Sequence, residues 1–216
     1  MPDYPHCLES DSLGDCWLQT SKLILEFGQL CRYEGAPIRE IAHLMLTIRS
    51  PDPQDPLIAQ YGDPGWLAWM HDNFFVQKEV AELGHAASYA IRLFNYANQG
   101  RDQIQWIVER LQGDPEARSA TVTTFMPLTD TTYIPCISLL DFWIPAGMVE
   151  LVVYAHSLDF GKKAYGNLVE LAHLQASVAS QLNQLMGKLI IHVKSAHIYE
   201  SEWDDMEKIC GRENGH

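Results

Sequence analysis

The stretch Tyr165–Val193, with the sequence YGNLVELAHLQASVASQLNQLMGKLIIHV, carries the clearest structural pattern in the chain. Tyr165–Met186 predicts a long helix, because mostly apolar side chains recur every three or four residues along one face. The short run Leu189–Val193 contains three β-branched residues and predicts a strand. The residues that mark the helix face are Leu168, Leu171, Gln175, Val178, Leu182 and Leu185.

The segments before this stretch repeat the alternation of helix and strand. Asp102–Leu111 predicts a helix with a regular apolar spacing, which the Gly-Asp-Pro sequence at 113–115 ends. Three β-rich segments predict strands: Ala120–Phe125, Ile137–Ile144 and Val149–Ala155. This order predicts an α+β fold, a mixed β-sheet packed against helices with one long central helix.

Two proline- and glycine-rich breaks lie in the first third of the chain, at Ser50–Pro56 and Tyr61–Gly65. Because proline opposes regular structure, they predict a boundary between an N-terminal helical part and the rest. We expect a single domain over 1–216. Its segment 1–60 is the least constrained by these patterns, and its polar tail 210–216 is expected to be frayed.

The bulk composition excludes several classes of protein. The 216 residues carry a formal net charge of -13, which argues against a nucleic-acid partner because phosphate binding needs clustered cations. No apolar run is long enough for a membrane span, and the first ten residues lack a basic signal-peptide region. The five scattered cysteines fit a reducing cytoplasm better than a disulfide framework or a metal site.

Four short clusters carry residues with chemical potential. Cys136 follows Pro135 at the entrance of a predicted strand, where its thiol can face a pocket or serve as a small buried hydrophobe. The other clusters are His156–Asp159, Gly161–Asn167 and Ser195–Tyr199. Their polar residues also suit strand ends, helix caps and satisfied core positions. Taken by themselves, the clusters predict a pocket and no particular reaction.

Together, in this order and with this spacing, the clusters resemble the thymidylate synthase superfamily, above all its short archaeal-type form. The resemblance runs from about Tyr89 to Trp203 and implies the thymidylate synthase-like fold. The stretches that carry it are Asp102–Gln105, Asp114–Ser119, Pro135–Cys136, Ser157–Asp159, Asn167 and Ser195–Tyr199.

The resemblance implies roles for the residues that would meet a nucleotide. Cys136 matches the nucleophile, which adds as a thiolate to C6 of a pyrimidine and makes C5 reactive toward a one-carbon electrophile. Asn167 matches the residue that contacts the uracil edge, since an amide both donates and accepts. His197 and Tyr199 match the pair that holds the sugar 3′-hydroxyl.

Further matches concern the co-substrate and the surroundings of the reacting carbon. Asp159 matches the aspartate that contacts the folate pterin, Tyr89 a tyrosine of the cavity wall, and Ser157 a phosphate-binding serine. The family also uses a glutamate near the one-carbon transfer site. Glu79 and Glu82, in a helix-like stretch before Tyr89, are both candidates, and a solvated helix face explains them equally well.

The chain departs from the family at the expected phosphate site. Arg118 matches an arginine that acts across a dimer interface, but its usual arginine neighbour is Ser119 here. The arginine expected before Ser157 is His156, which cannot form the planar bidentate contact of a guanidinium. Lys162 or Lys163 can compensate only as point charges.

The resemblance therefore predicts an enzyme that transfers a one-carbon unit from 5,10-methylenetetrahydrofolate to C5 of a pyrimidine nucleotide, with dUMP to dTMP ranked first. A pyrimidine nucleotide 5-hydroxymethylase acting on dUMP, CMP or dCMP ranks second. A non-catalytic nucleotide-binding member stays as a third reading. We also expect a homodimer with shared active sites, and no metal. Trp66 or Trp69 is a candidate for stacking on the folate.

Overall fold

The computed structural model describes residues 6–131 and 133–212, and its centre is a mixed eight-stranded sheet. The strand order is β1-β3-β10-β8-β7-β6, with β2 paired to β3 and β9 paired to β10. The strands are β1 (Cys7–Ser10), β2 (Gln29–Tyr33), β3 (Ala36–Ile48), β6 (Ala120–Thr123), β7 (Ile137–Trp143), β8 (Met148–Ala155), β9 (Leu158–Asp159) and β10 (Leu185–Tyr199). A separate pair consists of β4 (Glu79–Val80) and β5 (Ala86–Ala87).

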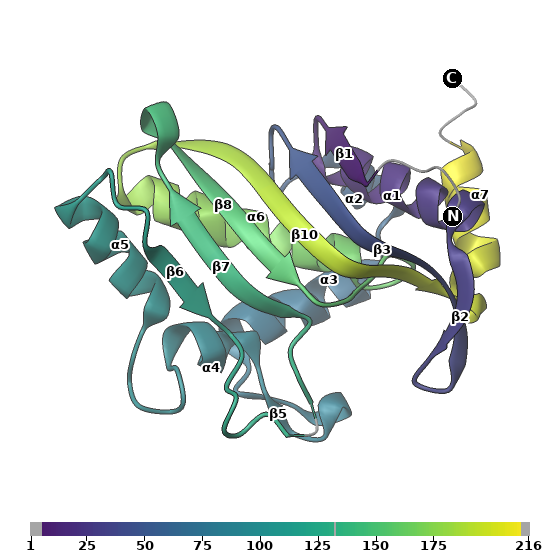
Figure 1. The fold of residues 1–216 in the computed structure, drawn as a ribbon, viewed down its shortest axis with the longest axis horizontal. Helices are drawn as coiled ribbons and strands as arrows, with labels where there is room; N and C mark the ends of the chain where they lie inside the picture. The colour runs from purple at the N-terminus through teal and green to yellow at the C-terminus, as the bar shows by residue number, and fades with distance from the viewer. Residues whose placement is uncertain (1–5, 132, 213–216) are drawn as a thin grey trace.

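Helices cover one face of this sheet, and α6 runs behind β8 and β10 in Figure 1. The α-helices are α1 (Leu13–Phe27), α2 (Pro56–Tyr61), α3 (Pro64–His71), α4 (Tyr89–Phe94), α5 (Gln103–Gly113), α6 (Ala164–Gln181) and α7 (Trp203–Arg212). Short π- or 3-10 turns are Asp72–Val76, Ala81–Leu83, Pro145–Gly147 and Glu200–Glu202. The predicted α+β class and the mixed sheet packed on helices are confirmed.

The alternation of side chains along β8 separates the core from an uncovered face. Val149, Leu151 and Val153 are buried toward the helices, whereas Met148 and Val152, at alternate positions of the strand, are exposed. No described helix lies in front of this second face in Figure 1. Other large hydrophobic side chains exposed along these strands are Met45, Leu139 and Trp143.

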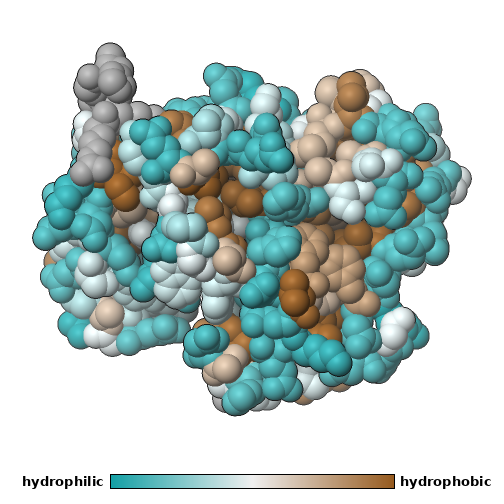
Figure 2. Space-filling view, turned by 180° about the vertical axis from the view of Figure 1, so that it is seen from behind, coloured by the Kyte–Doolittle hydropathy of each residue, from teal (hydrophilic) through white to brown (hydrophobic). Residues whose placement is uncertain are grey.

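The opposite side of the molecule is shown in Figure 2, where hydrophilic side chains predominate and hydrophobic ones gather in patches between them. The buried core behind this surface extends from Leu13 in α1 to Cys210 in α7. Among the described residues, no helix has the length and apolar character that a bilayer crossing requires.

Three sequence-based boundaries were wrong. The predicted helix Tyr165–Met186 ends at Gln181, because Asn183 takes up a left-handed conformation (φ 51°) that asparagine tolerates. Leu185 already belongs to β10 and is exposed, so its helix-like spacing was coincidental. The predicted strand Leu189–Val193 is the middle of β10, which continues to Tyr199.

The predicted N-terminal helical part contains α1 but is not helical throughout. After α1 it supplies β3, whose buried Leu44, Leu46 and Ile48 alternate with more exposed residues and pair with β10 inside the sheet. The expected frayed tail is partly wrong, since Cys210 is buried at the end of α7. Residues 213–216 of that tail lie outside the described range.

Candidate active site

A cavity of about 350 Å3 lies where β9, β10 and the beginnings of β7 and α6 meet. It brings together most of the side chains that the sequence analysis predicts for the site. Lys163 and Trp69 add a cation and an aromatic ring to the wall. The predicted residues that line it are Tyr89, Cys136, His156, Ser157, Asp159, Asn167, His197 and Tyr199.

Strand pairing explains why segments far apart in sequence meet here. β9 pairs in parallel with β10, which sets Asp159 opposite His197. The backbone N–H of His156 donates to the carbonyl of Cys136 at 2.9 Å, which joins the end of β8 to the entrance of β7. α6 begins shortly after β9, so Asn167 lies in its first turn and beside the same cavity.

The thiol of Cys136 is surrounded by groups with opposing effects on its charge. Ser157 Oγ donates a hydrogen bond to its Sγ at 3.7 Å. Burial raises the pKa of Cys136, the Ser157 bond and the charge of Lys163 act against this, and Asp159 raises it further. Because only the thiolate is a competent nucleophile, positive charge brought by a ligand or partner would activate this cysteine.

Two side chains present defined hydrogen-bonding groups to the cavity. The hydroxyl of Tyr89 accepts from the backbone N–H of Ile137 at 3.0 Å, and burial raises its pKa well above the ordinary value, so it keeps its proton. Asn167 donates from Nδ2 to the carbonyl of Lys163 at 3.0 Å, and no described residue bonds its amide oxygen. The cavity therefore offers a phenolic donor and an amide that can accept.

A cluster of three rings closes another side of the cavity. His197 and Tyr199 come from alternate positions of β10, with ring centroids 5.2 Å apart in an edge arrangement. Tyr33, from the end of β2, stands 5.5 Å from the His197 ring. Burial lowers the pKa of His197 and keeps the ring neutral at pH 7. A neutral imidazole can accept one hydrogen bond and donate another.

Asp159 is the carboxylate most strongly affected by the site. Burial raises its pKa to about 7, and the nearby Glu202 adds to the shift. The backbone N–H of Gly161 donates to Asp159 Oδ1 at 3.1 Å and acts in the opposite direction. Near neutral pH this group exists in both forms, so it can either donate to or accept from a polar heterocycle.

The cavity contains little positive charge. Among its described lining residues, Lys163 is the only lysine or arginine. Burial and the charge of Lys194 lower the pKa of His156, so this histidine is neutral at pH 7. Arg118 does not line the cavity, and its Cζ lies 5.4 Å from the Trp143 ring on the uncovered sheet face. A phosphate would find few cations within one chain.

The two candidate glutamates are not brought to the cavity. Glu79 lies in β4, where it is exposed and its Oε2 lies 3.4 Å from Nδ1 of His85. Glu82 is exposed in the short 3-10 turn Ala81–Leu83. The predicted helix-like stretch is therefore wrong, and neither carboxylate is among the lining residues. The glutamate that does line the cavity is Glu34, in the turn between β2 and β3.

Sequence reasoning missed several residues of the wall. Tyr33 and Glu34 reach the cavity only because β3 pairs with β10, and no local pattern reveals that pairing. Asn73 contributes its Oδ1 as acceptor for the backbone N–H of Tyr89 at 3.1 Å. Tyr133 stands three residues before Cys136, a proximity that could have drawn attention to it.

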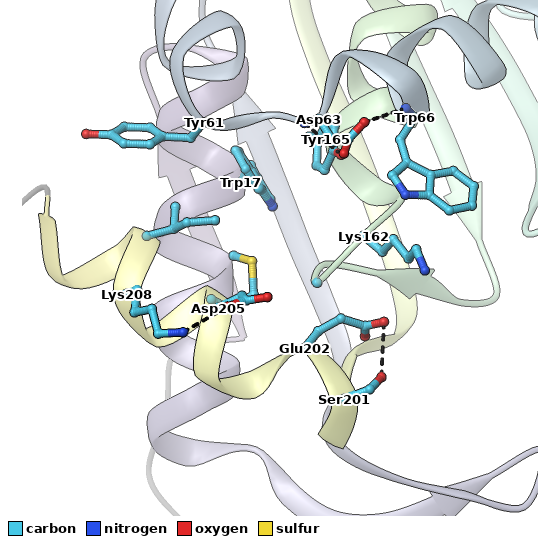
Figure 3. A pocket seen from close by; sticks show the side chains of 13 residues that line it. Trp17, Tyr61, Asp63, Trp66, Lys162, Tyr165, Ser201, Glu202, Asp205 and Lys208 are labelled. Carbon is cyan, nitrogen blue, oxygen red and sulfur yellow. Dashed lines mark hydrogen bonds and ion pairs between the residues drawn. The ribbon is translucent and has the colours of Figure 1, made fainter.

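A second cavity of about 550 Å3 is lined in part by Gly161 and Lys162, from the loop after β9 that also carries Lys163 of the first cavity (Figure 3). In Figure 3 the side chains of Trp17, Trp66 and Glu202 surround it. Lys162 lines this second cavity, with its Nζ 4.8 Å from the centre of the Trp66 ring, and not the first. Gly161 packs so closely on Glu202 that a Cβ there would meet its side chain at 2.9 Å.

The described part of the chain contains no group of three or more His, Cys, Asp and Glu side chains arranged to hold a metal ion. Fold and cavity together define a class: α+β proteins with a cysteine at a strand entrance facing a polar pocket sized for a small molecule.

Comparison with known proteins gives this class a family. A family model described as thymidylate synthase matches residues 36–216. A Methanosarcina acetivorans protein named "Putative thymidylate synthase" is 32% identical over 212 residues, covering 94% of this chain and 93% of the relative. A protein of the same name from Methanothermobacter marburgensis is 29% identical over 220 residues, covering 92% and 95%. The chain belongs to the thymidylate synthase family.

Proposed function

We propose that this protein transfers a one-carbon unit from 5,10-methylenetetrahydrofolate to C5 of a pyrimidine nucleotide, with dUMP as substrate and dTMP as product. One observation carries the proposal. A single cavity holds a cysteine, an amide, a neutral histidine and an aspartate whose pKa is about 7, all at positions that match the family's motifs.

The first step forms a bond between Cys136 Sγ and C6 of the pyrimidine. The thiol gives up its proton to solvent, and the Ser157 hydrogen bond and the charge of Lys163 favour the resulting thiolate. The electron pair of the C5–C6 double bond moves onto C5 and the carbonyl at C4. Asn167 hydrogen-bonds the edge of the ring, where its amide suits the acceptor and donor of uracil.

In the second step C5 attacks the methylene carbon of the folate, and the proton on C5 then passes to water, which is the event that tritium release would report. The carbon-nitrogen bond to the folate breaks and leaves an exocyclic methylene on the ring. Hydride from the tetrahydrofolate reduces it to methyl and yields dihydrofolate, whereas addition of water yields hydroxymethyl. Elimination of Cys136 restores the double bond. Asp159 is suited to contact the pterin, because it can donate or accept near neutral pH.

The test follows release of tritium from C5-labelled dUMP, UMP, dCMP and CMP together with absorbance at 340 nm. Tritium release from dUMP with rising absorbance supports thymidylate synthesis, and release without the absorbance change supports a hydroxymethylase. Cys136→Ser is expected to abolish release. Cys7→Ser, which changes an exposed cysteine outside the cavity, is the matched control. Nucleotide binding without release from any substrate would refute the proposal and favour a non-catalytic binder.

We further propose a homodimer in which Arg118 of the partner subunit completes the phosphate site. Two observations support it. The cavity of one chain has Lys163 as its only described lysine or arginine. Arg118 instead lies against Trp143 on the uncovered sheet face, which exposes apolar side chains. Packing of two such faces would bury this apolar surface and move Arg118 toward the other chain.

Mixing two inactive variants tests the shared site. Arg118→Ala and Cys136→Ser are each expected to lose activity as pure proteins. In a mixed dimer, one of the two sites has both an intact Cys136 and an intact Arg118. Mixing is therefore expected to restore about a quarter of wild-type activity, since half of the dimers are mixed. No recovery on mixing, with dimers present by sedimentation, would contradict a shared site.

We also propose a cytoplasmic location, which the free cysteines support because a reducing compartment keeps thiols from forming disulfides.

A further inference from the structure

A polar chain leads away from His197 into the sheet. Ser195 and His197 are alternate residues of β10, so their side chains share a face. Glu40 on β3 is the direct cross-strand partner of His197. Ser195 Oγ donates a short hydrogen bond to Glu40 Oε1 and stands 3.4 Å from His197 Nδ1. Cys31 Sγ donates to the second carboxylate oxygen at 3.7 Å.

These side-chain hydrogen bonds determine which ring nitrogen of His197 carries the proton. A serine hydroxyl has a single proton, and Ser195 gives it to the Glu40 carboxylate. The Ser195 oxygen can then only accept from Nδ1, so Nδ1 must be the N–H of the ring. Nε2 has no hydrogen-bond partner among the described residues and is left as an acceptor.

We infer that Glu40 is a positioning residue that acts through Ser195 to hold His197 with its proton on Nδ1, so that Nε2 accepts a hydrogen bond from a hydroxyl group of the nucleotide sugar. The identity of the hydroxyl rests on the proposed function, whereas the control of the tautomer does not. Without the carboxylate, the hydroxyl of Ser195 becomes free to donate to Nδ1. The proton of a neutral ring would then move to Nε2, which could no longer accept.

Strand pairing alone does not account for this arrangement. The backbones of β3 and β10 pair on both sides of Glu40, at Arg39 and Ile41. The backbone pairing of β3 with β10 therefore does not need the carboxylate of Glu40, which instead accepts hydrogen bonds from the side chains of Ser195 and Cys31. Through Ser195, the carboxylate of Glu40 therefore acts on His197, the side chain that borders the cavity.

The first experiment measures the tautomer directly and needs no activity. In protein labelled with 15N-histidine, the two neutral tautomers give distinct nitrogen shifts and proton couplings. His197→Gln assigns the signal. The wild type is expected to show His197 protonated on Nδ1, and Glu40→Ala is expected to shift the signal toward Nε2. Glu150→Gln, a carboxylate change on β8 outside the cavity, is the control and should leave the signal unchanged.

The second experiment measures what the tautomer does for binding. Affinities for dUMP and for 2′,3′-dideoxyuridine monophosphate are compared in the wild type and in Glu40→Ala and Glu40→Gln. The wild type should prefer dUMP by roughly tenfold, the worth of one well-placed hydrogen bond. Glu40→Ala should lose this preference with kcat little changed. Glu40→Gln should retain part of it, because its amide oxygen still accepts from Ser195.

The outcomes separate the inference from the proposed function. A tautomer that responds to Glu40→Ala, together with a lost preference for dUMP, supports both. A response without any binding of dUMP by the wild type supports the role of Glu40 and refutes the proposed substrate. A His197 signal that is the same in Glu40→Ala and wild type overturns the inference, even if the enzyme makes dTMP.

Discussion

Replacing Arg92 with leucine should destabilise the protein far more than an ordinary surface change. Arg92 lies in α4 with its side chain buried, and its guanidinium holds Asp130 through two hydrogen bonds of 2.7 and 2.9 Å. It also donates to the carbonyls of Thr124 at 2.7 Å and Ala87 at 2.9 Å. Leucine removes every one of these donors, and the side chain of Asp130 is itself only 6% exposed.

The expected magnitude follows from the carboxylate that is left behind. Removing one partner of a buried ion pair costs roughly 3–5 kcal/mol of unfolding free energy. The remaining Asp130 carboxylate would be left without a counter-charge and shielded from solvent, with the backbone N–H of Met126 as a hydrogen-bond donor. For a protein of this size each kcal/mol lowers Tm by about 2–4 °C, so Arg92→Leu should lower it by roughly 6–20 °C. Urea unfolding gives the free energy directly, and circular dichroism gives the Tm.

Two further variants identify the cause. Arg101→Leu removes an exposed arginine close to α4 and should change Tm by no more than a few degrees. Arg92→Leu combined with Asp130→Leu removes both charges and should recover a large part of the loss. The reasoning is refuted if Arg92→Leu unfolds within about 2 °C of the wild type, or if the double variant is as unstable as the single one.

Three other predictions concern the cavity. Asn167→Asp should shift preference from uracil toward cytosine nucleotides, since a protonated or ionised carboxyl suits the amino group at C4; competition binding with dUMP and dCMP measures it. The wild type is expected to lose unfolding free energy as the pH rises, and Asp159→Asn should abolish this dependence. Burial raises the pKa of Asp159 to about 7, so the wild type is favoured below the unfolded pKa and loses stability as pH rises through 7; urea unfolding at pH 5 and 8 should differ less in the variant, by on the order of 1–2 kcal/mol. His156→Arg should tighten nucleotide binding at pH 7.5 and make it more sensitive to salt, because the lowered pKa of His156 leaves it neutral there; unchanged affinity would remove this position from the phosphate site.

The sequence predicted the cavity residues that lie in recognisable motifs, but it did not predict the residues that distant segments bring to the cavity. Cys136, Asn167 and His197 were predicted as site residues because they lie in motifs whose order and spacing can be recognised in the linear sequence. Tyr33 and Glu34 were missed because they meet these residues only through the pairing of β3 with β10. Such pairing joins distant parts of the chain, and no local periodicity encodes it.

The errors in the elements have equally local causes. Leu182 and Leu185 continue the apolar spacing of α6, but Asn183 at positive φ turns the chain and Leu185 starts a strand. Periodicity cannot distinguish an amphipathic helix from a helix followed by a strand when leucines fall at compatible positions. Glu79 and Glu82 followed a helix-like pattern over a segment that instead forms β4 and a 3-10 turn.

The position of β10 has a consequence for how the protein is made. β10 is the last described strand along the chain, yet it lies in the sheet between β3 and β8. While β10 is still being synthesised, the newly made strands cannot form one continuous sheet, and the edges of β3 and β8 that face the gap have no partner. Unpaired edges of this kind invite association with other chains, so a nascent chain paused before β10 is the form most in need of a chaperone. His197 and Tyr199 arrive with the same strand, and the nascent chain therefore acquires its complete cavity only when the sheet closes.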